Sequence, residues 1–334
     1  MTNRNIRLNN EPFLLRPAAK GYLWGGTRLN DDFAKGINMD PLAETWECST
    51  HPDGVSMVAS GTHKGRLLSD VLSDNPSYLG TRSGPGKDLP ILVKLIDAKK
   101  KLSVQVHPDD VYAMACEKDR RGKNEMWYVL DASKEASLLY GFHHAIDKEK
   151  LKNSIEQGTV ERHLLRIPVK KDDVFYIPAG KVHAIGAGVL VAEIQENSNL
   201  TYRLYDYNRV GKGGKKRELH IEKALDVADL RGNEEPGQPL RVLRYKPGCA
   251  AELLCRCKHF EVQRMLVNTE RYRKLVEYQA DSISFRVLLC IGGCGTFFYG
   301  EHEQFPYFKG DCIFFPAESG ARIHGRAEFL AISG

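Results

Sequence analysis

The sequence lacks any apolar run long enough to form a membrane-spanning helix, which needs about 20 consecutive apolar residues. Its first fifteen residues, MTNRNIRLNNEPFLL, also lack the apolar core of a signal peptide. These absences argue against a membrane partner and favour a cytoplasmic location.

Paired cysteine motifs and long charged tracts are missing as well. The eight cysteines show no CxxC spacing and are too sparse for a disulfide scaffold, so we expect free thiols. The formal net charge of +5 is spread along the chain, which favours a small anionic molecule over nucleic acid as the partner. One basic stretch, GKGGKKR at 211–217, is either a solvated loop or a loop that holds phosphate.

What is present is typical of a globular protein with a large core. The chain has 334 residues, of which 42% are hydrophobic and 27% charged. The polar segment RGNEEPGQPL at 231–240 predicts a domain boundary. We therefore expect one domain over residues 1–235 and a second over residues 236–334.

Short strand-like runs recur throughout and are separated by Gly, Pro, Asp and Asn, which is typical of a β-sandwich or barrel. The runs occupy residues 89–97, 102–108, 126–132, 173–180, 189–196, 260–267, 284–293 and 311–317. Helical periodicity is local, at residues 66–80, 109–119, 147–158 and 220–230. The sequence thus predicts a mainly β protein with a few peripheral helices.

The stretch SVQVHPDD at 103–110 carries polar side chains on one face of a strand. Gln105 and His107 alternate with valines, so both point the same way and could converge on one ion. Glu125 begins a later strand, and His183 follows a turn. Imidazole, carboxylate and amide groups suit Zn²⁺, with Fe, Mn, Co or Ni as substitutes. Singly, each residue could equally be an ordinary turn or surface residue.

Three cations could accompany such a site. Lys94 lies inside the apolar run ILVKLID, where an ammonium is costly unless paired, so it is either an active-site residue or half of a buried ion pair. Lys123 shares a strand face with Glu125 or lies in an exposed loop. Arg203 is either packed on neighbouring tyrosines or a fixed cation for phosphate or developing negative charge.

Several motifs resemble those of the type I mannose-6-phosphate isomerases, in the short form. They are VKLIDAKKKLSVQVHPDD, KNEMWYVLDA, IPAGKVHAIGAGVLVAEIQENSN and TYRLYDYNR, with YLWGGTRL, AETWECSTHPDG and RELHIEKALD. The resemblance covers most of residues 10–230 in order and is loose beyond residue 240.

This resemblance implies two cupin domains, which are jelly-roll β-barrels, with one Zn²⁺ per chain in the first and a metal-free second. It implies interconversion of mannose 6-phosphate and fructose 6-phosphate. The family's metal ligands fall on Gln105, His107, Glu125 and His183. Its active-site lysines fall on Lys94 and Lys123, and its catalytic arginine falls on Arg203.

The expected reaction moves a proton between C1 and C2, so it needs a base, a Lewis acid and an anchor for phosphate. Arg203 would stabilise the developing charge. The base is open between a zinc-bound hydroxide, Lys123 and Glu196. Lys94 is the expected phosphate anchor, assisted by Ser103 and Arg217.

One departure from the family keeps other functions in view. Asn199 stands where many relatives have Asp, and an amide cannot exchange a proton as a carboxylate can. A non-catalytic sugar-phosphate-binding or regulatory cupin is therefore an alternative, and an Fe(II) oxygenase is another, although Gln105 in place of a histidine argues against it. The number of subunits is left open, a monomer included.

Overall fold

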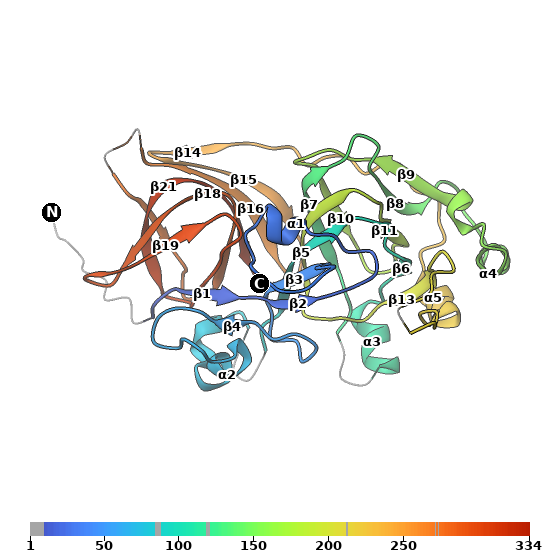
Figure 1. The fold of residues 1–334 in the computed structure, drawn as a ribbon, viewed down its shortest axis with the longest axis horizontal. Coiled ribbons are helices and arrows are strands. Elements are labelled where there is room, and N and C mark those ends of the chain that lie inside the picture. The colour runs from blue at the N-terminus through green and yellow to red at the C-terminus, as the bar shows by residue number, and fades with distance from the viewer. Residues whose placement is uncertain (1–9, 84–87, 118–120, 212, 271, 273) are drawn as a thin grey trace.

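Three antiparallel sheets form the framework of the protein (Figure 1). The computed structural model describes residues 10–83, 88–117, 121–211, 213–270, 272 and 274–334. The mainly β fold with few helices is confirmed. The beginning of the chain, residues 118 and 119 of the helix expected at 109–119, and Lys212 of the basic stretch lie outside the described residues.

The first sheet has six strands in the order β10-β7-β12-β5-β3-β2. They are β10 (Val174–Ile177), β7 (Glu125–Ala132), β12 (Val189–Glu196), β5 (Ile91–Ala98), β3 (Glu44–Cys48) and β2 (Ala18–Lys20). Strands β5 and β12 are buried along their whole length. Alternate residues of each enter different hydrophobic clusters, because both faces of this sheet are covered.

A second sheet of five strands packs on one of these faces, in the order β13-β6-β11-β8-β9. They are β13 (Tyr202–Tyr205), β6 (Val104–Val106), β11 (His183–Ile185), β8 (Ser137–Phe142) and β9 (Leu164–Pro168). Side chains from both sheets, such as Trp127 and Ile185, share one buried cluster. The polar face of the short strand β6 is therefore directed toward the six-stranded sheet.

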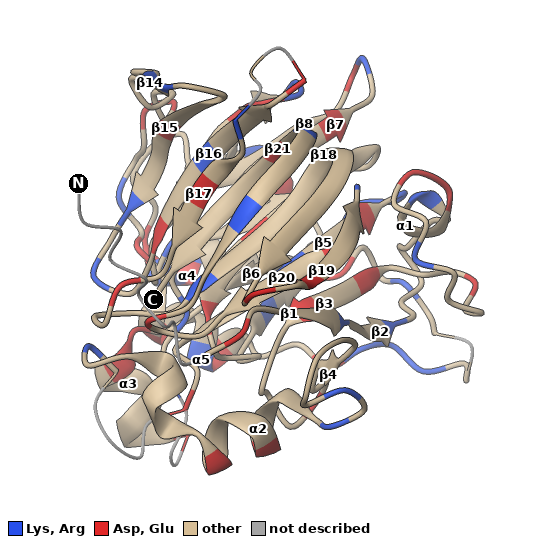
Figure 2. Cartoon of the chain, turned by 90° about the vertical axis from the view of Figure 1, so that its left-hand side faces the viewer, with Lys and Arg blue, Asp and Glu red and all other residues tan. Residues whose placement is uncertain are grey.

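The third sheet has ten strands and takes most of them from the C-terminal part of the chain. Its order is β14-β15-β16-β21-β18-β20-β1-β4, with β17 on β21 and β19 on β18. The strands are β14 (Arg244–Lys246), β15 (Cys249–Arg256), β16 (Glu261–Asn268), β17 (Val276–Gln279), β18 (Arg286–Tyr299), β19 (Glu303–Phe308), β20 (Cys312–Phe315), β21 (Gly320–Ser333), β1 (Phe13–Arg16) and β4 (Met57–Val58). Most of their length is uncharged (Figure 2).

Two strands of this sheet, β1 and β4, come from the beginning of the chain. Strand β1 pairs with β20 on one side and with β4 on the other. The largest hydrophobic cluster also joins the ten-stranded sheet to the outer face of the six-stranded one, through residues such as Ile194 and Val262. The division at residues 235 and 236 stays a prediction.

Four of the helices fall where periodicity predicts them. Within 66–80 lie α2 (Leu68–Asp74) and a 3-10 turn (Pro76–Leu79), and the other three expected ranges hold α3 (Asp110–Cys116), α4 (Lys148–Glu156) and α5 (Ile221–Val227). Asp109 caps α3 by accepting a hydrogen bond from the Tyr112 amide at 2.8 Å. Periodicity does not predict α1 (Arg28–Asp31) or a 3-10 turn (Val160–His163), because each is only one turn long.

Phe314 anchors β1 to the C-terminal strands, because its ring stacks between those of Phe13 and Phe285 at centroid distances of 5.3 and 5.4 Å. Phe314→Ala would leave a cavity where the ring is fully buried. We expect it to lower the free energy of unfolding by about 3–5 kcal/mol in urea titrations. Phe308→Ala is the control, since that ring is 58% exposed. Equal losses in the two variants would contradict the proposed packing.

Candidate metal centre and cleft

The four predicted metal ligands come together between the six- and five-stranded sheets. Gln105 lies on β6 and His107 directly after it, while Glu125 begins β7 and His183 begins β11. Pairing of β11 with β6 sets His183 opposite Gln105. Strand register thus unites residues that are far apart in the sequence.

The distances within this group are short. Nε2 of His183 lies 3.1 Å from Oε1 of Glu125, and Nε2 of His107 lies 3.6 Å from Oε2. Nε2 of Gln105 lies 3.3 Å from Nε2 of His183, and a half-turn of the amide would present its oxygen instead. His107, Glu125 and His183 are at most 1% exposed, and their ligand atoms lie within 4.8 Å of one another.

Backbone carbonyls orient both imidazoles. Nδ1 of His107 lies 2.8 Å from the oxygen of Leu200, and Nδ1 of His183 lies 2.7 Å from that of Lys181. Each Nδ1 therefore carries the proton, and each Nε2 turns its lone pair toward the carboxylate of Glu125. Lone pairs that face one another in a buried site repel, so they favour a cation between them. The arrangement fits a metal ion held by Nε2 atoms whose Nδ1–H groups are tied to carbonyls.

Lys123 supplies a cation beside this group. Its Nζ lies 2.6 Å from Oε2 of Glu125 and 3.2 Å from Nε2 of His107. Burial lowers the pKa of His107 well below its ordinary value, and the ammonium of Lys123 lowers it further. Burial alone would raise the pKa of Glu125, but the ammonium of Lys123 beside it brings the pKa well below its ordinary value. Glu125 is therefore an anion and His107 a neutral donor, as metal ligation requires.

A cleft of about 210 Å³ lies beside the ligands. Its walls hold six of the residues that the sequence analysis singled out: Lys94, Ser103, Gln105, Lys123, Arg203 and Arg217. Tyr22, Glu44, Glu193 and Asn199 line it as well. A family model of the phosphomannose isomerase type I catalytic domain matches residues 13–135.

Mannose-6-phosphate isomerase ManA of Bacillus subtilis is 37% identical to this chain over 327 residues, which cover 97% of the chain and 99% of that protein. The chain belongs to the type I phosphomannose isomerase family. The probable mannose-6-phosphate isomerase GmuF of the same organism is 47% identical over 66% of this chain and 69% of its own length. A crystal structure of the Bacillus subtilis mannose 6-phosphate isomerase superposes with a TM-score of 0.87 at 34% identity and covers 97% of this chain and 100% of that chain.

Lys94 forms a buried ion pair in this family member. Its Nζ lies 2.9 Å from Oε1 of Glu193 and 5.1 Å from the ring centre of Trp46. Burial would lower the pKa of Lys94, but Glu193 and Glu44 raise it above its ordinary value, so the ammonium stays charged. Glu193 also accepts a hydrogen bond from the Trp127 indole at 2.9 Å. Glu193 was not among the predicted site residues, although an acid inside the apolar run VLVAEIQE is as unusual as Lys94 in its own strand.

Arg203 and Arg217 extend the positive side of the cleft. Nε of Arg203 lies 3.3 Å from Oγ of Ser103, and Nη1 donates to the backbone oxygen of Glu218 at 2.8 Å. Arg217 donates to both carboxylate oxygens of Asp206. Burial and the nearby Arg217 lower the pKa of Arg203, yet a guanidinium remains charged at neutral pH. Both cations are thus held in place before any anion arrives.

The structure does not bring Glu196 into the cleft. It shares a face of β12 with Ile194, which packs toward the ten-stranded sheet, so alternation turns its carboxylate away from the ligands. Oε1 accepts hydrogen bonds from Asn124, and Oε2 lies 3.0 Å from Nδ1 of His259. The position of Glu196 therefore gives no support to its expected role as a base.

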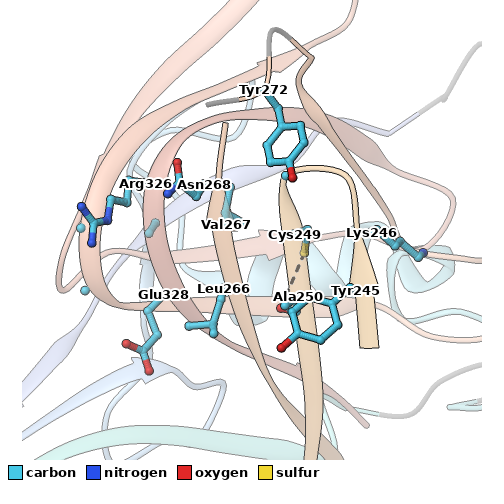
Figure 3. Close-up of a pocket in the computed structure, with 14 residues that line it drawn as sticks. Tyr245, Lys246, Cys249, Ala250, Leu266, Val267, Asn268, Tyr272, Arg326 and Glu328 are labelled. Carbon is cyan, nitrogen blue, oxygen red and sulfur yellow. Dashed lines mark hydrogen bonds between the residues drawn. The ribbon is translucent and has the colours of Figure 1, made fainter. Parts of the chain in front are cut away.

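Another hollow, with a volume of about 550 Å³, lies on the ten-stranded sheet (Figure 3). Arg326 and Lys246 extend from opposite sides of it, and its described walls include no histidine. The chemistry-bearing groups are instead concentrated around the smaller cleft.

Glu193→Gln tests the buried ion pair. The glutamine keeps a hydrogen-bonding side chain but leaves the ammonium of Lys94 without its closest anion. We expect the free energy of unfolding to fall by about 3–5 kcal/mol in urea titrations. Glu222→Gln is the matched control, because Glu222 pairs with Lys152 at 2.6 Å on the exposed surface and should contribute little. A silent Glu193→Gln variant would show that Lys94 does not depend on this partner.

Proposed function

We propose that this protein interconverts mannose 6-phosphate and fructose 6-phosphate by aldose–ketose isomerisation. Membership of the type I family supports this reaction. The observation that carries it is the convergence of two imidazoles and a carboxylate on one buried point beside a cleft lined with cations. Such a site can polarise sugar oxygens and attract a phosphate ester in the same small volume.

We assign one Zn²⁺ per chain to Gln105, His107, Glu125 and His183. Two imidazole nitrogens with oxygen donors from a carboxylate and an amide match the preferences of this ion. When bound, the ion would supply Lewis acidity toward the oxygens on C1 and C2 of the sugar. Glu125 would balance its charge, and the carbonyls behind the imidazoles would keep the Nε2 lone pairs aimed at it.

Arg203 would stabilise the negative charge that develops on the sugar oxygens during proton transfer. Its guanidinium is positioned by Ser103 and by the backbone of Glu218, so little reorganisation is needed when that charge appears. Of the two side chains that the sequence offers as bases, Lys123 lines the cleft and Glu196 does not. We therefore assign the movement of the proton between C1 and C2 to Lys123, which would act as a free amine once the bound ion, in place of its own ammonium, balances the charge of Glu125.

Phosphate binding falls to Arg217 and Ser103, since both line the cleft. Lys94 lines it too, but Glu193 and Trp46 already surround its ammonium. We propose that Lys94 mainly neutralises Glu193 in the cleft wall and attracts the phosphate less strongly than an unpaired lysine would.

An isomerase explains the site better than a non-catalytic sugar-phosphate-binding cupin. A binding protein needs the cations but has no use for a buried set of metal ligands next to them. Asn199 lines the cleft and donates to Asp53 at 2.8 Å, so a carboxylate lies next to the position where many relatives have Asp.

No helix in the described residues is long and apolar enough to cross a membrane. We place the enzyme in the cytoplasm, where sugar phosphates are metabolised.

Removal of metal should abolish the reaction. After dialysis against EDTA, we expect isomerisation of mannose 6-phosphate to stop in a coupled assay, because neither sugar oxygen would be polarised. Added Zn²⁺ should restore it, with about one ion bound per chain by elemental analysis. Full turnover in chelator would remove the metal from the proposed function.

Arg203→Ala should separate catalysis from metal binding. We expect kcat to fall by about 10²–10³, the usual cost of losing one preorganised donor to a developing charge. The zinc content should stay that of the wild type, since the guanidinium is not a ligand. Arg166→Ala, at a guanidinium with a side chain 52% exposed, serves as the control. Near-normal kcat in Arg203→Ala would exclude this residue from the mechanism.

A further inference from the structure

A histidine of the C-terminal strands reaches toward the metal centre. His259 lies in the turn between β15 and β16, and its Nδ1 is 3.0 Å from Oε2 of Glu196. The carboxylate of Glu196 is almost completely buried at the end of β12. The hydrogen bond to Glu196 raises the pKa of His259, in keeping with a charged imidazolium against an anion. This pair joins the ten-stranded sheet to the six-stranded one.

Glu196 in turn holds Asn124. Its Oε1 accepts one hydrogen bond from the backbone amide of Asn124 at 2.9 Å and another from the side-chain Nδ2 at 2.7 Å. The backbone amide of Glu196 donates back to the oxygen of Asn124 at 3.1 Å. Asn124 stands between Lys123 and Glu125 in the chain. Three hydrogen bonds, two to its backbone and one to its side chain, therefore fix Asn124 directly before the carboxylate ligand.

Asn124 extends the same network to the segments that carry the two histidines. Its Oδ1 accepts from the backbone amide of Ala179 at 3.0 Å. The next residue, Gly180, donates its amide to the backbone oxygen of His107 at 2.8 Å. The turn that contains Ala179 and Gly180 leads directly into His183. One side-chain amide thus connects the backbone around three of the four ligands.

We propose that His259 is a positioning residue for the metal centre and acts through Glu196 and Asn124. It holds the second oxygen of Glu196, so that the first stays aligned with both donors of Asn124. Without His259, a buried carboxylate oxygen would lose its partner, and the side chain could turn away from Asn124. The C-terminal strands then contribute to ligand geometry although they provide no ligand. The inference rests on the proposed metal-dependent function.

A second metal site is the competing explanation for the same side chains. Ligand atoms of Asp110, Glu196 and His259 lie within 4.8 Å of one another. However, Asp110 already accepts from the backbone amide of Gly122 at 2.9 Å, and Oε1 of Glu196 is taken by Asn124. An imidazolium between two carboxylates satisfies these groups without an ion. One bound ion per wild-type chain agrees with positioning, and two ions per chain would overturn it.

The test compares His259→Ala with His259→Asn in the full-length protein. We expect His259→Ala to weaken Co²⁺ binding about 10-fold in competition with a chromophoric chelator, the cost typical of groups that orient metal ligands. The same variant should lower kcat and leave the KM for mannose 6-phosphate within about twofold, because the cleft walls are untouched. His259→Asn should recover most of the metal affinity, since its Nδ2 can donate to Glu196 from the place of Nδ1.

His324→Ala is the matched control, because that exposed histidine lies on β21 of the same sheet. All proteins are compared well below their thermal unfolding midpoints. Wild-type Co²⁺ affinity in His259→Ala would overturn the inference, as would an equal loss in His259→Asn and His259→Ala. Failure of the proposed function looks different: the wild-type protein would then bind metal weakly or not at all, or would bind it without isomerising mannose 6-phosphate.

Discussion

The buried carboxylate of Glu125 is the constraint on which the rest of the structure depends. A fully buried anion is costly unless positive charge lies beside it. The ammonium of Lys123 supplies such a charge 2.6 Å from one oxygen, while the Nε2 atoms of His107 and His183 face the carboxylate at 3.6 and 3.1 Å, as donors to a shared cation would. The cost of burying a single charge also explains why Lys94 and Glu193 occur together on two otherwise apolar strands: each is the partner of the other in the cleft wall.

Much of this centre could be predicted from local pattern. The two-residue period of a strand sets Gln105 and His107 on one face, and the capping position of Asp109 explains why the neighbouring acids belong to a helix start. Buried strands such as β5 read as continuous apolar runs, so their existence was evident. Strand register, which the sequence does not give, brings Gln105 and His107 together with Glu125 and His183. That part of the prediction depended on the family resemblance rather than on residue spacing.

Contacts that depend on how sheets pack could not be predicted in the same way. No periodicity indicates that Phe13 belongs beside Phe314, because the partners lie at opposite ends of the chain and either would be apolar in any core. Glu196 shows the same limit: alternation gives the face it shares with Ile194, but only the packing of sheets decides that this face meets His259 rather than the cleft.

The C-terminal strands provide none of the four predicted ligands, yet they pack against the sheet that carries Glu125. Aromatic side chains such as Phe297, Tyr307 and Phe329 fill the interior of the ten-stranded sheet, with ring centres 4.7–6.0 Å apart. This core is filled with apolar rings. The ten-stranded sheet meets the six-stranded one outside that core, where an apolar cluster packs the two sheets together and the His259–Glu196 pair adds a charged hydrogen bond.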